Sequence, residues 1–166
     1  MTREWEVSAE RFVAASPAAV YATVADPHRM GALSPECIGV WWRGSGTAPQ
    51  GAKFIGWNRR AAWVWFTECR VVTAEPEREF AFVVTSFGLP IAKWGYRLAA
   101  GEGGTTLTEY WEDMRKPSTR GKLAEVLGLV FTGTPAQARA GRNREGMRET
   151  LDRVAVAVEG GVPKGA

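Results

Sequence analysis

Histidine and cysteine are scarce in this chain, and that scarcity excludes several kinds of site. The 166 residues include a single histidine, His28, and two cysteines, Cys37 and Cys69. A zinc site needs several Cys or His ligands at short spacings, so the sequence predicts no metal and no cofactor. The cysteines lack CxxC spacing, and two reduced thiols in a cytoplasmic protein are the expected state. His28 follows Asp26-Pro27, where we expect a capping or surface role.

Familiar catalytic and targeting motifs are missing as well. No GxSxG nucleophile turn occurs, and the stretch 44–46 (Gly-Ser-Gly) lacks the lysine of a phosphate-binding loop. The charged, alternating N-terminus does not resemble a signal peptide, and no apolar run reaches the roughly 18 residues of a membrane span. We therefore predict a cytoplasmic protein with no stable membrane insertion.

The charge balance gives little reason to expect a nucleic-acid partner. The formal net charge is only +3, and nucleic-acid binding favours a strongly basic surface with interleaved aromatic residues. Arginines do gather toward the C-terminus, but at helical spacing beside an apolar stripe, which predicts a solvated helix face. These arginines are Arg139, Arg142, Arg144, Arg148 and Arg153.

Tryptophan, in contrast, is abundant, with eight in the chain. Trp57, Trp63, Trp65 and Phe66 fall within ten residues, in a stretch that alternates like two strands joined by a short turn at 58–62. Each indole contributes roughly 150–250 Å² of buried area, which is more than a small sheet needs to close its core. Such a sheet either packs tightly on a helix or forms the wall of a cavity.

The order of predicted elements gives the fold class. A half-buried strand at 3–12 precedes two short helices, at 17–25 and 27–33, which begin at Ser-Pro and Asp-Pro signals. About six strands follow between residues 38 and 115, separated by hairpin-length turns. The stretch 44–46 (Gly-Ser-Gly), in the loop 44–51, is interpreted as a mobile lip over a cavity mouth.

The C-terminal part is predicted to be helical. A first apolar stripe covers 122–131, and a long helix follows from about 136 to 159. Burial is efficient only if the sheet curls around this long helix. The prediction is one α+β domain over residues 1–160, with about seven antiparallel strands, two short helices after the first strand and a disordered tail at 161–166.

This order resembles the START-like (SRPBCC) superfamily with the helix-grip, Bet v 1-like fold, in particular the bacterial polyketide cyclase/dehydrase branch. The resembling segments cover nearly the whole chain, and none is a catalytic signature. They are 16–21 (SPAAVY), 24–27 (VADP), 30–36, 51–54 (GAKF), 56–59 (GWNR), 69–72 with Glu75-Pro76, 105–109 (TTLTE), 143–147 and 150–151.

The resemblance implies a hydrophobic pocket between the sheet and the C-terminal helix. Relatives bind lipids, sterols or hormones, or assist the aromatic cyclisation of polyketides, and the fold alone does not decide between these roles. We expect a small hydrophobic ligand that is aromatic, polyketide or lipid-like, and a homodimer is compatible with the sequence. A cofactor-free cyclisation or dehydration, a non-catalytic carrier or sensor, and an interaction module with a filled core all stay open.

Two residues are candidates for proton handling. Alternation in the strand 105–115 places Leu107, Glu109 and Trp111 on one face. If that face is concave, Glu109 projects into the cavity with a raised pKa and can act as a general acid or base. Tyr96, one strand away, could offer its hydroxyl at the cavity wall. The alternatives are a solvated Glu109, or one paired with Arg97.

The pocket wall is predicted from the same alternation. Phe66 is assigned to the outer face, Trp57 is left undecided, and Arg59 and Arg60 are interpreted as solvated turn residues. The predicted ligand-binding residues are Trp63, Trp65, Phe82, Trp94, Trp111, Leu127 and Met147.

Overall fold

A curled antiparallel sheet forms the body of the molecule in the computed structural model, which describes residues 4–115 and 136–160. The strand order is β1-β7-β6-β5-β4-β3-β2, so consecutive strands are neighbours except where β1 pairs with β7. The strands are β1 (Glu6–Val13), β2 (Cys37–Trp41), β3 (Lys53–Arg60), β4 (Trp63–Glu75), β5 (Glu79–Ser86), β6 (Leu89–Gly101) and β7 (Gly104–Asp113). The predicted α+β class, the strand number and the antiparallel pairing are confirmed.

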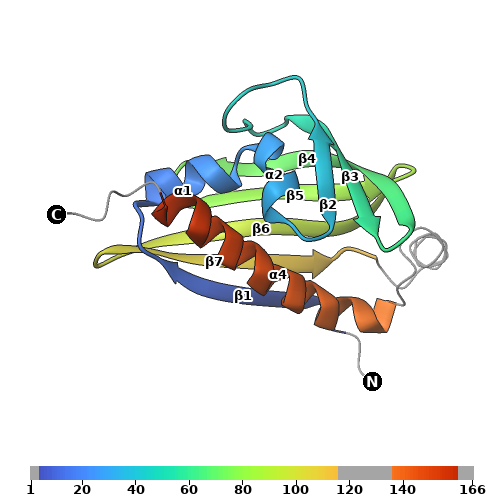
Figure 1. Cartoon of the computed structure of the whole chain (residues 1–166). Helices are drawn as coiled ribbons and strands as arrows, with labels where there is room; N and C mark the ends of the chain where they lie inside the picture. The colour runs from blue at the N-terminus through green and yellow to red at the C-terminus, as the bar shows by residue number, and fades with distance from the viewer. Residues whose placement is uncertain (1–3, 116–135, 161–166) are drawn as a thin grey trace.

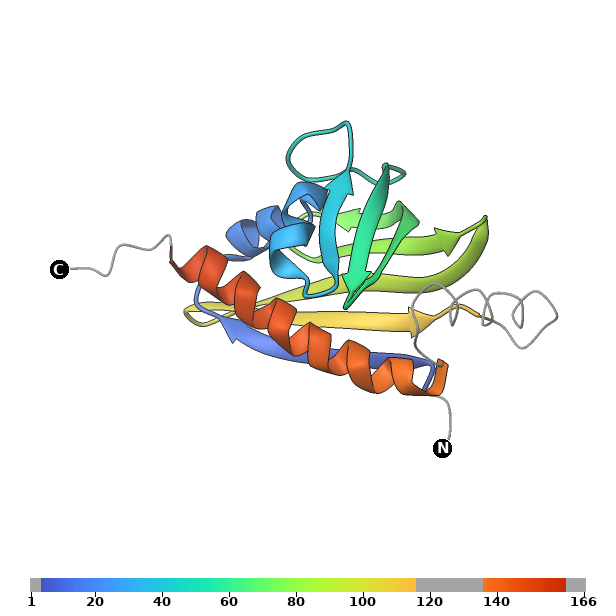
Figure 2. The ribbon, with the colours of Figure 1, turned by 45° about the vertical axis from the view of Figure 1, so that its right-hand side comes forward.

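Helices cover one side of this sheet (Figure 1). Two short elements follow β1, as predicted: α1 (Pro17–Val24), and then η1 (Pro27–Arg29) leading directly into α2 (Met30–Leu33). Their starts use the expected chemistry, because Ser16 Oγ accepts from the Ala19 amide and Asp26 Oδ1 accepts from the His28 amide. The long helix α4 (Ala136–Glu159) crosses the concave side diagonally, as Figure 2 shows from a second direction.

The core between α4 and the sheet consists of two clusters. In the larger one, Leu151 and Val154 of α4 pack with Val13 of β1 and Leu107 of β7. In the second, Met147 packs with Trp111. The larger cluster extends across the sheet to Phe54 of β3 and Phe80 of β5, whereas the second lies between β1, β6, β7 and α4.

The convex face of β6 and β7 is closed by a glycine and a tyrosine. Gly95 lies opposite Tyr110, and a Cβ atom on Gly95 would stand 2.4 Å from the phenol ring. The Tyr110 hydroxyl donates to Glu79 Oε1 at 2.6 Å, and the Arg97 guanidinium lies 4.1 Å from the ring centroid. Tyr110 is therefore buried on the outer face, and the alternation of β7 leaves Leu107, Glu109 and Trp111 for the concave side.

The outer face of β2–β4 carries aromatic residues in contact with solvent. Trp57, left undecided by the sequence, pairs across the strands with Phe66, and their rings lie 5.7 Å apart. Both are about half exposed, at 44% and 49%. The prediction that Phe66 faces outward is thus correct, and Trp57 shares that face.

One expectation about the loop 44–51 is wrong. None of its residues lines the cavity described below. Instead, the loop is attached beside α1, where Ala48 is buried and its amide donates to the Ala25 carbonyl. His28 Nε2 lies 3.0 Å from the Gly44 carbonyl oxygen, which ties the loop to η1. These contacts hold the loop away from the cavity mouth, so it is not the predicted lip.

Candidate functional site

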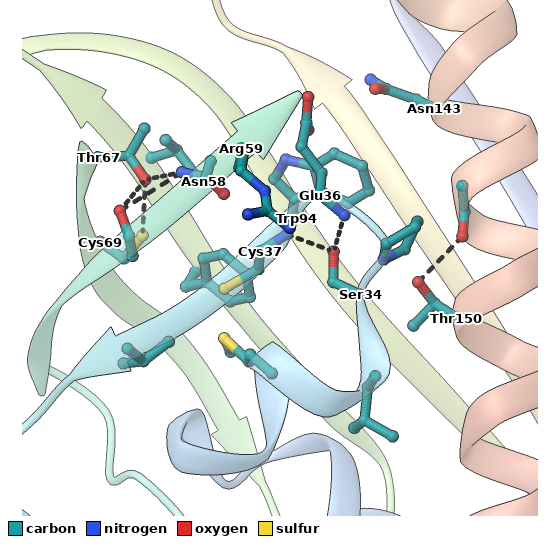
Figure 3. A pocket seen from close by; sticks show the side chains of 18 of the residues that line it. Ser34, Glu36, Cys37, Asn58, Arg59, Thr67, Cys69, Trp94, Asn143 and Thr150 are labelled. Atoms are coloured by element: carbon teal, nitrogen blue, oxygen red, sulfur yellow. Dashed lines mark hydrogen bonds between the residues drawn. The ribbon is translucent and has the colours of Figure 1, made fainter. Parts of the chain in front are cut away.

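A cavity of about 530 Å³ lies between the concave side of the sheet and the helices α2 and α4. This volume is in the range of small-molecule sites. Strands β2 to β7 supply one wall, and α4 supplies the other (Figure 3). The tryptophan-rich sheet therefore leaves open space in its interior. An interaction module, in contrast, would need a filled core.

The inner wall carries a buried acid and a buried phenol. Glu109 of β7 is 4% exposed and Tyr96 of β6 is 8% exposed. The two residues are cross-strand partners, and the Tyr96 hydroxyl donates to Glu109 Oε1 at 3.1 Å. The other carboxyl oxygen, Oε2, is buried without a partner among the described residues.

Burial controls the protonation of this pair. Desolvation raises the pKa of Glu109 to about 8, and the hydrogen bond from Tyr96 lowers it only in part. The pKa of Tyr96 is raised well above its usual value, first by desolvation and then by the nearby Glu109. At neutral pH both side chains are therefore uncharged, and Glu109 is a carboxylic acid with a proton to donate.

Arg97 does not neutralise Glu109, although the sequence left that pairing open. Arg97 is on the opposite side of the sheet, where its Nε lies 3.7 Å from Glu79 Oε1. Alternation along β6 explains the result, because Tyr96 and Arg97 are successive residues and point to opposite faces. Glu109 therefore faces the cavity and keeps its proton.

The helix wall contributes two polar side chains, Asn143 and Thr150, which Figure 3 shows projecting from α4 toward the cavity. The Thr150 hydroxyl donates to the Gly146 carbonyl oxygen at 3.0 Å. Asn143 is 5% exposed, and its Nδ2 atom is buried without a partner among the described residues. Unsatisfied buried polar groups are rare in native proteins and call for an explanation.

Strands β3 and β4 add a polar group whose hydrogen bonds stay within the protein. Asn58 Nδ2 lies 3.3 Å from Thr67 Oγ1 and 3.4 Å from the Gly56 carbonyl oxygen. Cys69, next along this face, has a pKa raised to about 12, chiefly by burial. Its thiol is therefore uncharged and is a poor nucleophile.

The mouth of the cavity is lined by charged residues. Arg139 of α4 forms a two-point pair with Glu36, with distances of 3.2 and 2.8 Å to the two carboxylate oxygens. Arg59 and Arg142 also line the opening and are exposed. Arg59 was interpreted as a solvated turn residue; the structure places it at the end of β3, beside the mouth.

The structure brings together five of the predicted site residues in one cavity: Trp65, Phe82, Trp94, Tyr96 and Glu109. Trp63 lies on the same face of β4 as Trp65, but it is at the end of the β3–β4 hairpin and is 55% exposed. Trp111 and Met147 do point inward, yet they pack against each other in the second core cluster and do not line the cavity. Leu127 and the predicted helix 122–131 lie outside the described residues.

Several lining residues were missed by the sequence analysis, above all Asn143, Asn58 and Arg142. Asn143 had a detectable signal, because it precedes Met147 and Leu151 by four and eight residues and so lies on the apolar stripe of the helix. A lone amide on such a stripe indicates a buried polar role. Arg142 had none, since exposed arginines are frequent on this helix.

The described residues hold no cluster of three or more His, Cys, Asp or Glu side chains arranged for a metal ion. Among the same residues, no helix combines the length and the apolar composition needed to cross a membrane.

The sheet, its helices and the enclosed cavity define a helix-grip protein of the START-like superfamily. The chain belongs to the family described as polyketide cyclase / dehydrase and lipid transport, whose sequence model matches residues 4–159. The resemblance drawn from the sequence is thereby confirmed, and with it a ligand-binding fold.

Solved structures agree with this assignment. A Polyketide_cyc-like protein from Corynebacterium glutamicum, Cgl2372, is 31% identical, with 96% of this chain and 94% of that chain covered and a TM-score of 0.62. The Zhui aromatase/cyclase from Streptomyces sp. R1128 is 16% identical, with 96% of both chains covered and a TM-score of 0.69. The di-domain ARO/CYC StfQ of the steffimycin biosynthetic pathway is 13% identical, with 94% of this chain and 51% of that chain covered and a TM-score of 0.69. The last two share the fold only. No curated protein sequence matches the chain.

Proposed function

We propose that this protein binds a small hydrophobic molecule, aromatic or polyketide-like, in the cavity and assists a cofactor-free cyclisation or dehydration of it. The observation that carries this proposal is Glu109, a buried neutral acid that lines the cavity and whose Oε2 atom has no hydrogen-bond partner among the described residues. An acid with a pKa near the working pH is well suited to proton transfer. Trp65, Phe82 and Trp94 provide the apolar walls that position the ligand.

The proposed reaction needs no external reagent. Glu109 gives its proton to the hydroxyl group of a bound β-hydroxy ketone, the C–O bond breaks, and the hydroxyl leaves as water with the bonding electron pair. The α C–H bond breaks, its electron pair forms the C=C bond, and the Glu109 carboxylate takes the proton. The acid is restored and the net change is the loss of water. Tyr96 acts as a positioning residue that holds Oε1, so that Oε2 faces the ligand.

A carrier or sensor is the second candidate, because it needs the same cavity. It has no use for a titratable group, whereas keeping an unsatisfied carboxyl group buried costs stability. Glu109 therefore favours the catalytic function over the carrier.

Ligand binding can be tested by filling the cavity from the helix side. Gly146 lines the cavity, and a Cβ atom there would meet only the Pro35 ring, at 3.6 Å. We expect Gly146→Phe to weaken binding of the neutral fluorescent probe N-phenyl-1-naphthylamine by about tenfold or more, because the phenyl ring would occupy cavity volume that the probe needs. The control is Gly141→Phe on the same helix, where a Cβ atom meets nothing within 4 Å. Equal affinity of the two variants would contradict a ligand site here.

Catalysis can be tested with 4-hydroxy-4-phenylbutan-2-one, whose dehydration gives a conjugated enone followed by its ultraviolet absorbance. We expect Glu109→Gln to retain probe binding and to lower the rate by about 10²–10⁴, the usual contribution of a general acid. Tyr96→Phe removes the hydrogen bond that lowers the pKa of Glu109, so the alkaline limb of its rate profile should move to higher pH. Probe binding without turnover in the parent protein would identify a carrier.

A further inference from the structure

The outer face of β2–β4 presents a continuous group of apolar side chains to solvent. The strand register places Trp41 opposite Ile55 and Trp57 opposite Phe66, all on this one face, and Val64 continues it along β4. Trp41 and Val64 are more than half exposed, and Trp57 and Phe66 are nearly so. Single exposed apolar residues are ordinary, whereas a contiguous group marks an interaction surface. We call these five residues the outer aromatic patch.

The outer aromatic patch is separate from the cavity. None of its five residues lines the cavity, and the described helices lie on the concave side of the sheet (Figure 1). Among the described residues, therefore, no helix packs over these side chains. A role for this surface goes beyond the proposed function, because it does not depend on what the cavity binds.

Cations accompany the outer aromatic patch. Lys53 and Arg70 lie directly opposite each other on β3 and β4, an arrangement of like charges that destabilises a sheet. The Arg43 guanidinium lies 5.9 Å from the centroid of the Trp41 ring. All three cations are exposed, and none forms an ion pair with a described carboxylate. Glu68 is the only acidic residue in β2, in β3 and in the part of β4 that pairs with β3.

This charge distribution selects the chemistry of the partner. A second copy of the chain, related by a two-fold axis, would offer the same surface. The unpaired cations of the two copies would then meet, with one Glu68 from each copy to offset them. A nucleic acid would supply negative charge, but Ile55 and Val64 have no π face on which a base could stack. An anionic surface that also accepts hydrocarbon satisfies both the cations and the apolar side chains.

We propose that the outer aromatic patch docks the protein reversibly onto membrane surfaces that contain anionic lipids. Tryptophan side chains favour the interface between lipid headgroups and acyl chains, and here Trp41 and Trp57 enter it. Lys53, Arg70 and Arg43 are drawn to the negative headgroups. The protein lies on the membrane without spanning it, with the concave side of the sheet and its helices directed away from the lipid.

The test is cosedimentation of the full-length protein with vesicles. One set contains equal parts of phosphatidylcholine and phosphatidylglycerol, and the other contains phosphatidylcholine alone. We expect the parent to bind the anionic vesicles at least about tenfold more tightly, because each Lys or Arg near an anionic surface adds to the affinity. Raising the salt to about 1 M should abolish most of this difference, since the Debye length falls from about 10 Å to about 3 Å.

Variants on the two sides of the sheet locate the contact. Trp57→Ala should weaken binding to the anionic vesicles about fivefold, and Lys53→Glu about tenfold or more. Phe12→Ala is the control for the aromatic residue, because Phe12 is half exposed on β1, at the other edge of the sheet. Arg148→Glu is the control for the charge, since it changes the net charge equally but lies exposed on α4. Both controls should bind the vesicles like the parent.

The proposal is overturned if the parent binds neither kind of vesicle, or binds both equally well. It is also overturned if Arg148→Glu weakens binding as much as Lys53→Glu, since net charge alone would then explain the affinity. A parent that sediments in solution as a dimer, which Trp57→Ala dissociates, would assign the patch to a second copy instead. Without vesicles, Trp57→Ala should bind N-phenyl-1-naphthylamine like the parent. Membrane docking and the cavity function therefore fail independently of each other.

Discussion

Raising the pH from about 5 to 9 should destabilise the parent protein relative to its Glu109→Gln variant by a few kcal/mol. The pKa of Glu109 is raised from 4.5 to about 8 by burial in the folded protein. Between these two values the folded state keeps the proton and the unfolded state has lost it. The free energy of unfolding therefore falls as the pH rises, with a limiting slope of roughly 1.4 kcal/mol per pH unit.

The sign is opposite to that of a carboxylate in a salt bridge, which stabilises the fold more as the pH rises. The protonated Glu109 therefore contributes its full share to the free energy of unfolding below about pH 4.5, and this contribution is lost above about pH 8. Tyr96, which is bonded to Glu109, and Cys37, which interacts with Tyr96, do not disturb this range, because burial raises the pKa of both groups from already alkaline values. They stay neutral while Glu109 titrates.

Urea unfolding at pH 5.5, 7 and 8.5 measures the effect. Glutamine has the shape of the protonated acid and cannot ionise, so Glu109→Gln should remove the slope assigned to this residue. Glu112→Gln is the matched control, since Glu112 lies on the same strand but on the solvent side, with Lys93 at 3.8 Å. It should retain the slope of the parent. A parent and a Glu109→Gln variant with the same pH dependence would show that Glu109 is solvated.

Truncating Trp111 should be the most damaging tryptophan substitution near the site. Trp111 is 2% exposed and packs against Val7 and Met147, joining β7 to β1 and α4. We expect Trp111→Ala to lower the free energy of unfolding by about 3–5 kcal/mol, the usual range for a large aromatic residue in a packed core. Denaturant unfolding followed by circular dichroism gives the value.

Trp57→Ala is the matched control, with the same atoms removed from the outer face of the sheet. Trp57 is 44% exposed and contacts Phe66 there, so its loss should cost about 1 kcal/mol or less. Similar losses for the two variants would contradict the different roles assigned to these tryptophans. The comparison also separates core indoles from cavity indoles, because Trp65 borders empty space and should fall between the two.

Local sequence patterns were sufficient for the fold. The Ser-Pro and Asp-Pro signals correctly predicted α1 and η1, and the 3.6-residue period predicted α4 at its observed bounds. The helix starts depend on contacts between residues that are close in the chain. The 3.6-residue period arises because one face of the helix is apolar and packs against the sheet. Alternation also made Glu109 and Tyr96 candidates for the cavity wall, and the register between β6 and β7 then showed that they are partners.

What alternation could not predict is which inward side chains meet empty space. Trp63, Trp65 and Trp111 all have inward parity, but the first is exposed at the end of a hairpin, the second borders the cavity and the third is packed in the core. Alternation determines the face of the strand on which a side chain lies. The residues that pack against that face come from elements distant in the sequence. The sequence by itself determined the helix-grip architecture and singled out Glu109 as a candidate acid, while the face on which it lies stayed open. Only the tertiary structure decided which inward side chains line the cavity, and that Asn143 of α4 is among them, because both depend on how α4 packs across the sheet.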